Sequence, residues 1–272
     1  MDLQIFQVDA FTSTPFGGNP AAVVPLTEWL PDESLMDIAA ENNLSETAFF
    51  VKGDSGYDIR WFTPKVEVNL CGHATLASAY VIFNCLKAEE DGIFFNSHRS
   101  GPLGVTRSGD TMTLDFPAYD INEVEQSAEL ADAVGVIPSR TWETKGNKIM
   151  LLLESETEVR ELAPDFNALL DIPYDGVIVT AKGDTADFVS RMFAPRIGIP
   201  EDPVTGAMHC SLIPYWSEAL GKREMFARQV SARGGELFCE MAGDRVKIGG
   251  KATLYMKGEI YVASERSVTA GS

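Results

Sequence analysis

Basic residues are scarce in this chain. It contains 22 lysines and arginines against 40 aspartates and glutamates in 272 residues, which gives a formal net charge of −18 at pH 7. Proteins that bind nucleic acid use lysine and arginine to neutralise phosphates, and anionic membrane surfaces attract the same side chains. The composition therefore argues against both kinds of partner. An anionic small substrate would have to be held by local groups, against the overall field of the protein.

Cysteine is also scarce, and the four cysteines at positions 71, 85, 210 and 239 form no CxxC pair. The first residues, MDLQIFQVDAF, lack the basic and then apolar pattern of a secretory signal. The apolar run at residues 74–83 is too short to cross a bilayer at about 1.5 Å per helical residue. We therefore expect a cytoplasmic protein with reduced thiols and a buried helix at this run.

Sequence patterns for cofactors are missing as well. The chain contains neither a phosphate-binding loop nor a GxGxxG pattern, so it does not predict a bound nucleotide. No two histidines, cysteines or carboxylates have the spacing of metal ligands on one helix face. We expect no cofactor and no metal.

The segment at residues 60–83, RWFTPKVEVNLCGHATLASAYVIF, dominates what is present. Its first part favours a strand, a turn follows at Cys71 and Gly72, and the rest is apolar or small on every helical face. A strand, a glycine turn and a buried helix in this order leave free N–H groups at the helix start. The segment therefore predicts an anion site beside Gly72 and His73.

This segment has a second copy at residues 191–216, RMFAPRIGIPEDPVTGAMHCSLIPYW. Gly72 aligns with Gly206, and at the same offset the segment at 100–114 aligns with the segment at 234–248. Chance explains any single match, but matches in the same order favour a duplication with a period near half the chain. The repeat predicts an α+β fold of two similar lobes. The strands that we expect cover residues 3–11, 21–25, 47–52, 57–63, 101–107, 111–116, 148–153, 176–181, 187–193, 229–233, 236–241, 245–248 and 258–263.

The lobes are expected at residues 1–117 and 118–257, with the strand at 258–263 returning to the first lobe and the tail from Ser264 frayed. Further helices are expected from residue 31, near residues 164–170 and after Gly206.

Positions that differ between the two copies are where a site could lie, because a duplicated scaffold keeps what the fold needs. Glu46 aligns with Gly176, His73 aligns with Ala207, and the segment 200–202, which contains Asp202, looks inserted. A base and an acid near two helix starts could move a proton at a carbon next to a carboxylate. Each residue also has an ordinary explanation: a solvated strand-edge charge, a packed helix-start residue and a turn residue before proline.

Four motifs together resemble the phenazine-biosynthesis (PhzF-like) isomerase family, which is related to diaminopimelate epimerase. They are DAFTSTPFGGNPAAVV at 9–24, NLSETAFF at 43–50, RWFTPKVEVNLCGHATLASA at 60–79 and EDPVTGAM at 201–208. The resemblance implies two pseudo-symmetric lobes, each a barrel-like sheet around a central helix, with the active site in the cleft between them. It also implies acid/base isomerisation without a cofactor, often in a homodimer.

The resemblance assigns the catalytic residues to positions that the asymmetry already selects, namely Glu46, His73 and Asp202. The same motifs supply the expected substrate-binding residues, which are Asn19, Ser45, Gly72, Thr205, Gly206 and Ala207. The sequence departs from the family's usual pattern at Asn69, where aspartate is more usual, and at Ala207, where serine or asparagine often follows Thr-Gly. Both departures bear on the substrate more than on the scaffold.

Three hypotheses follow for the function. The first is a cofactor-independent isomerase that acts on a small carboxylate-bearing substrate, with Glu46 carrying the proton and amides at Gly72 and Gly206 holding the carboxylate. The second is an amino-acid racemase or epimerase that uses Cys71 with Asp202. The third is a binding protein that keeps the cleft without the reaction.

Overall fold

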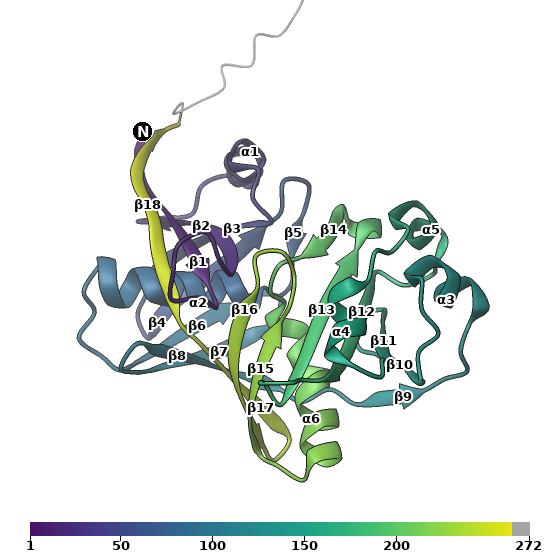
Figure 1. The fold of residues 1–272 in the computed structure, drawn as a ribbon. Coiled ribbons are helices and arrows are strands. Elements are labelled where there is room, and N and C mark those ends of the chain that lie inside the picture. Colours follow the sequence, from purple (N-terminus) through teal and green to yellow (C-terminus); the bar gives the residue numbers. More distant parts are fainter. Residues whose placement is uncertain (263–272) are drawn as a thin grey trace, which may run out of the picture.

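The computed structural model describes residues 1–262, and in this range eighteen strands form one continuous hydrogen-bonded network. Two long buried helices, α2 (Gly72–Tyr80) and α6 (His209–Leu220), lie in different halves of the molecule (Figure 1). All of α2 except Tyr80 is buried, as its small and apolar side chains predict. The α+β class and the two lobes, each built around a buried helix, are confirmed.

In the first lobe, α1 (Asp32–Asn42) packs Leu35, Ile38 and Ala39 against the outer face of the sheet. Helix α2 continues into a π-helical turn, η1 (Val81–Cys85). The strands of this lobe are β1 (Asp2–Ala10), β2 (Asn19–Leu26), β3 (Glu46–Gly53), β4 (Gly56–Phe62), β5 (Glu67–Val68), β6 (Gly92–Ser97), β7 (Gly101–Ser108) and β8 (Thr111–Pro117).

In the second lobe, three short helices lie on the outer side of the sheet and two 3₁₀ turns flank the segment that leads to α6 (Figure 1). These elements are α3 (Ala128–Val134), α4 (Glu156–Glu161), α5 (Phe166–Asp171), η2 (Pro195–Ile197) and η3 (Gly206–Met208). The strands are β9 (Ile121–Glu123), β10 (Arg140–Thr144), β11 (Lys148–Leu152), β12 (Gly176–Lys182), β13 (Phe188–Ala194), β14 (Ile199–Asp202), β15 (Glu224–Gln229), β16 (Gly235–Ala242), β17 (Arg245–Gly250) and β18 (Ala252–Tyr261).

Strand pairing reproduces the internal repeat. The parallel pair β2–β3 in the first lobe corresponds to β11–β12 in the second, and the parallel pair β4–β6 corresponds to β13–β15. A bidentate ion pair recurs at the equivalent position of each lobe, between Arg60 and Glu67 in the first and between Arg191 and Glu201 in the second. The duplicated scaffold therefore holds in three dimensions.

The register corrects our alignment of the second copy. We expected residues 200–202 to be an insertion, which is wrong for Glu201, because it occupies the place of Glu67. The additional residues lie earlier, where the chain forms η2. Asp202 pairs with Met192 as Val68 pairs with Trp61, so Asp202 still lacks a carboxylate counterpart.

Two expected strands differ from the structure. The segment 229–233 is a turn, and its strand is β15, which ends at Gln229. This turn leaves the sheet because Arg233 donates to the carbonyl oxygens of Gly17 and Gly18 in the other lobe. The last strand, β18, begins at Ala252 and pairs along β1, whereas the expected strand end and the tail beyond residue 262 lie outside the described residues. Strands β5, β6, β9, β10 and β14 were not expected.

The lobes share their interior. One cluster of buried apolar residues includes side chains of α2, such as Leu76, and of α6, such as Leu212 and Ile213. No helix within residues 1–262 has both the length and the apolar character needed to cross a membrane. The boundary between residues 117 and 118 stays a prediction.

Candidate functional site

Three predicted catalytic residues meet between the lobes. Glu46 is the first residue of β3, His73 is the second residue of α2, and Asp202 is the last residue of β14. The distance from His73 Nε2 to Glu46 Oε2 is 3.3 Å, and these side chains are 4% and 12% exposed. Asp202 lies close enough for its charge to act on Glu46. The structure therefore brings Glu46, His73 and Asp202 together from both halves of the chain.

Asn19 links the two lobes at this point. Its Nδ2 lies 3.1 Å from His73 Nδ1, and it donates to Asp202 Oδ1 at 2.7 Å and to the Val204 carbonyl oxygen at 2.9 Å. The amide has two hydrogens for these three neighbours and shares them among the three acceptors. Because an amide nitrogen cannot itself accept, His73 Nδ1 is the unprotonated ring nitrogen and the proton of the neutral ring is on Nε2. Asn19 Oδ1 is buried without a hydrogen-bond partner among the described residues, so it can accept one from a ligand.

His73 is neutral in this site. Burial lowers the pKa of its ring to about 3, because the imidazolium form would lose its hydration. A neutral ring whose Nε2–H faces Glu46 is a hydrogen-bond donor rather than a proton reservoir at neutral pH. We therefore assign it an orienting role within the cluster.

The two carboxyl groups have separated pKa values. Burial, reinforced by the charge of Asp202, raises the pKa of Glu46 to about 8, while a hydrogen bond from the Cys71 thiol opposes the rise. Burial raises the pKa of Asp202 to about 6, and hydrogen bonds from Thr205 and Asn19 limit that rise. Between these values the pair holds one proton. Two carboxyl groups with pKa values pushed apart are suited to acid and base roles near neutral pH.

The start of α2 touches the start of η3, the 3₁₀ turn that leads into α6. A Cβ atom added to Gly72 would lie 3.1 Å from Gly206 Cα, so neither position has room for a side chain. The Ala74 amide in the first turn of α2 does donate to the Cys71 sulfur, whereas no capping side chain takes the amides of Gly72 and Gly206.

The other predicted binding residues lie around this contact. The Thr205 hydroxyl donates to Asp202 Oδ2, and its carbonyl oxygen is 2.9 Å from His209 Nδ1. Ser45 and Ala207 are half-buried beside Glu46 and Gly206 in the chain. The structure thus places all six predicted binding residues near the cluster, and their contact with a substrate stays a prediction.

Glu46, Cys71 and His73 offer three buried groups whose ligand-type atoms lie within 4.8 Å of one another. Helix spacing did not reveal this set, because Glu46 comes from a different element. Metal ligation needs a thiolate and an unprotonated ring nitrogen. Asn19 instead places the ring proton on the nitrogen that faces Glu46, and burial raises the pKa of the Cys71 thiol well above its usual range. In the protein as described, these three groups share protons with one another.

Gln229 is a site residue that sequence reasoning missed. Its Nε2 donates to the Asp202 carbonyl oxygen at 2.6 Å, and its Oε1 accepts from the Thr205 amide at 2.7 Å. Gln229 lies 24 residues after Thr205 in the chain, and we expected it to be the first residue of a strand. No local pattern could have assigned it to this site.

Comparisons with known proteins agree with this geometry. A family described as phenazine biosynthesis-like protein (PhzC-PhzF) matches residues 8–258. An uncharacterized isomerase of Pseudomonas aeruginosa is 52% identical over 260 residues, which cover 96% of this chain and 99% of the relative. A crystal structure of a PhzF-family phenazine biosynthesis protein from Enterococcus faecalis has a TM-score of 0.93 at 46% identity, and the match covers 96% of this chain and 100% of that one.

A more distant match defines the fold alone. A hydroxyproline epimerase from Agrobacterium vitis has a TM-score of 0.62 at 12% identity, over 95% of this chain and 92% of that one. The architecture is therefore epimerase-like, and the relatives named as isomerases indicate that this chain is an isomerase. The chain belongs to the phenazine biosynthesis-like (PhzC-PhzF) family.

Proposed function

We propose that this protein is a cofactor-independent isomerase that moves a proton between two positions of a small carboxylate-bearing substrate. The observation that carries the proposal is the buried pair of carboxyl groups, Glu46 and Asp202, with pKa values of about 8 and about 6. A group with a pKa close to the working pH can both take and return a proton at low cost.

Each residue has a role in this proposal. Glu46 carries the proton between the two carbon positions, since its buried carboxyl group has a pKa of about 8 and lies beside the His73 ring and the Cys71 thiol. His73 orients the substrate through Nε2–H, and Asp202 takes part as the second carboxyl group. The uncapped amides at Gly72 and Gly206 hold the substrate carboxylate, where helix N–H groups favour negative charge.

The racemase alternative with Cys71 has less support. A thiol base must ionise, whereas burial and the neighbouring Glu46 carboxylate raise the pKa of the Cys71 thiol. Burial also raises the pKa of the Cys210 thiol to about 12, so this thiol is no better suited to act as a base. Cys71 instead donates to Glu46 and adjusts the acidity of the proton carrier.

The test is solvent deuterium exchange, followed by mass spectrometry or NMR. A pool of cyclic and acyclic amino acids and enamine-like carboxylates is incubated in deuterated buffer with the wild type, Glu46→Gln and Cys71→Ser. We expect deuterium to enter one class of compound with the wild type and with Cys71→Ser, and the rate to fall at least ~100-fold with Glu46→Gln. Exchange that persists in Glu46→Gln would refute Glu46 as the carrier. Loss in Cys71→Ser alone would favour the racemase, and ligand binding without exchange would favour the binding protein.

A further inference from the structure

Beyond the pairing of Asp202 with Met192, the segment from Asp202 to Thr205 is held by side chains. A different side chain hydrogen-bonds to each of two backbone groups in this segment. Asn19 donates to the Val204 carbonyl oxygen, and the Ser231 hydroxyl donates to the Pro203 carbonyl oxygen at 2.8 Å. Gln229 takes the two end groups, the Asp202 carbonyl oxygen and the Thr205 amide. The position of the Asp202 carboxylate therefore depends on residues outside the reacting cluster.

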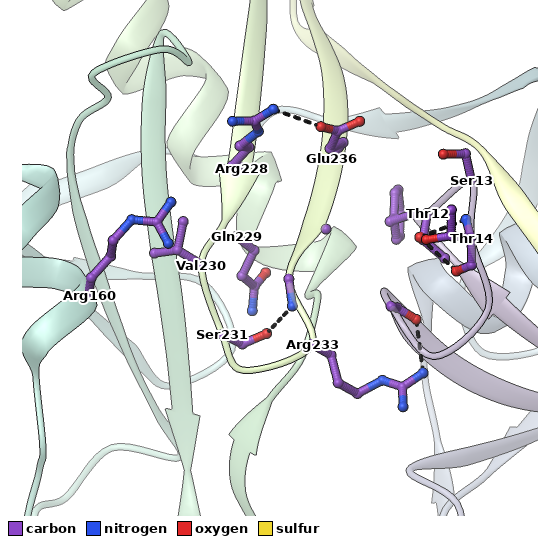
Figure 2. Close-up of a pocket in the computed structure, with 14 residues that line it drawn as sticks. Thr12, Ser13, Thr14, Arg160, Arg228, Gln229, Val230, Ser231, Arg233 and Glu236 are labelled. Atoms are coloured by element: carbon purple, nitrogen blue, oxygen red, sulfur yellow. Dashed lines mark hydrogen bonds and ion pairs between the residues drawn. The ribbon is translucent and has the colours of Figure 1, made fainter.

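Gln229 is buried, and its side-chain amide is fully hydrogen-bonded in this contact. Its side chain is 1% exposed, and both ends of the amide are bonded to the same segment. It ends β15 at the wall of a cavity of about 330 Å³, and Ser231 and Arg233 follow it in the turn that Figure 2 shows. A buried amide with both functions satisfied on one four-residue segment fixes that segment in one arrangement.

Ser97, the equivalent residue of the first lobe, makes no such contact with the neighbouring strand. Ser97 ends β6 opposite Gly101, as Gln229 ends β15 opposite Gly235. The Ser97 hydroxyl accepts from two amides of its own turn, at 3.3 Å each, and stays within that turn. The longer side chain at Gln229 reaches across to β14, so this contact is another place where the two lobes differ.

The contact also reaches the Asp202 carboxylate. Gln229 Nε2 lies 3.4 Å from Thr205 Oγ1, and an N–H group in that position donates to the hydroxyl oxygen. The hydroxyl proton is then directed to Asp202 Oδ2, to which Thr205 donates. A hydrogen bond to a carboxylate favours its charged form.

We infer that Gln229 is a positioning residue of this site, which holds the Asp202–Thr205 segment so that the Thr205 hydroxyl donates to the Asp202 carboxylate. The inference rests on the proposed function, in which Asp202 handles a proton. The ionisable groups whose charges interact with Asp202 are Glu46 on β3, Glu201 on β14 and Cys71 before α2. His73 lies next to Asn19, and His209 lies next to the Thr205 carbonyl oxygen.

The test is a titration of Asp202 that needs no substrate. Protein labelled with ¹³C at the aspartate carboxyl groups is followed by NMR from pH 4 to pH 9, and the Asp202 signal is assigned from its absence in Asp202→Asn. In Gln229→Met we expect the Asp202 midpoint to rise by about one pH unit, because the carboxylate loses an oriented hydrogen bond. In Gln126→Met, which removes a side-chain bond to the Pro138 carbonyl oxygen far from the site, we expect no change.

A second variant guards against misfolding. Gln229→Glu keeps the size of the side chain, and its carboxyl group retains both bonds while protonated but loses the donor when ionised. We expect an upward shift of the Asp202 midpoint here too, and an exchange rate that approaches the wild-type rate only below the pKa of the introduced group. An unchanged Asp202 midpoint in both variants overturns the inference.

The outcomes separate this inference from the proposed function. A shifted midpoint in a protein whose wild type exchanges no compound would leave Gln229 as a positioning residue and refute the isomerase. An unchanged midpoint, in a protein whose exchange depends on Glu46, would leave the isomerase and refute the role of Gln229.

Discussion

Glu46 is expected to make the stability of the protein fall as the pH rises. Its pKa is about 8 in the folded protein, against an ordinary value of 4.5. Below pH 4.5 the carboxyl group is protonated in both states and has no effect through ionisation. Between pH 4.5 and pH 8 the carboxyl group ionises in the unfolded chain but stays protonated in the folded protein, which favours unfolding. The resulting loss in the free energy of unfolding is complete above pH 8. Replacement by glutamine removes this dependence.

The magnitude follows from the two pKa values. One unit of pKa difference corresponds to about 1.4 kcal/mol, so the full loss above pH 8 is about 5 kcal/mol. The same linkage gives a loss of about 0.8 kcal/mol at pH 5 and about 3.3 kcal/mol at pH 7. The free energy of unfolding of Glu46→Gln, relative to wild type, should therefore rise by about 2.5 kcal/mol between pH 5 and pH 7.

Urea unfolding of both proteins at half-unit steps from pH 5 to pH 8 measures this difference. The contribution of Asp202 is present in both proteins and cancels in the comparison. Glu28→Gln, a substitution at an exposed loop position, is the matched control, for which we expect a flat difference. A flat difference for Glu46→Gln as well would refute the raised pKa, and with it the reason for assigning the proton to Glu46.

Two further substitutions test the scaffold of the site. Gly72→Ala adds a Cβ atom 3.1 Å from Gly206 Cα, so the helix starts must separate, and we expect the exchange rate to fall at least ~10-fold. Gly92→Ala, whose added Cβ has no neighbour within 4 Å, is its control. Arg191→Met removes one partner of a largely buried ion pair with β14 and should cost about 3 kcal/mol in urea unfolding. Arg228→Met, at a more exposed pair, should cost less than about 1 kcal/mol, and equal losses would contradict the role of burial.

The sequence predicted the scaffold well because duplication leaves a periodic record. Gly72 and Gly206 mark two helix starts in the alignment, and in the structure these glycines touch. The same comparison selected Glu46 and His73, because positions that the fold does not require to match are free to differ. Strand pairing then places Thr47, which follows Glu46, opposite Phe62, as Val177, which follows Gly176, lies opposite Phe193. This is the equivalence of Glu46 and Gly176 that the alignment predicted.

The sequence predictions were wrong where contacts between distant segments, rather than local residue spacing, determine the structure. A loop insertion can be placed at several positions in an alignment. Only the pairing of Glu201 with Phe193, like that of Glu67 with Phe62, showed that Glu201 has a counterpart. A strand was expected after Gln229, where contacts of Arg233 with the other lobe turn the chain away. Such long-range contacts leave no local pattern in the sequence.

The sequence alone determined the duplicated α+β architecture, the two buried helices and the residue types of the site, because these depend on side-chain periodicity and on motifs within single segments. The tertiary structure decided the proton positions. Burial between the lobes separates the pKa values of Glu46 and Asp202, the amide of Asn19 selects the tautomer of His73, and Gln229 holds the Asp202 segment. These properties come from desolvation and from hydrogen bonds between distant segments, which exist only once the lobes have packed together.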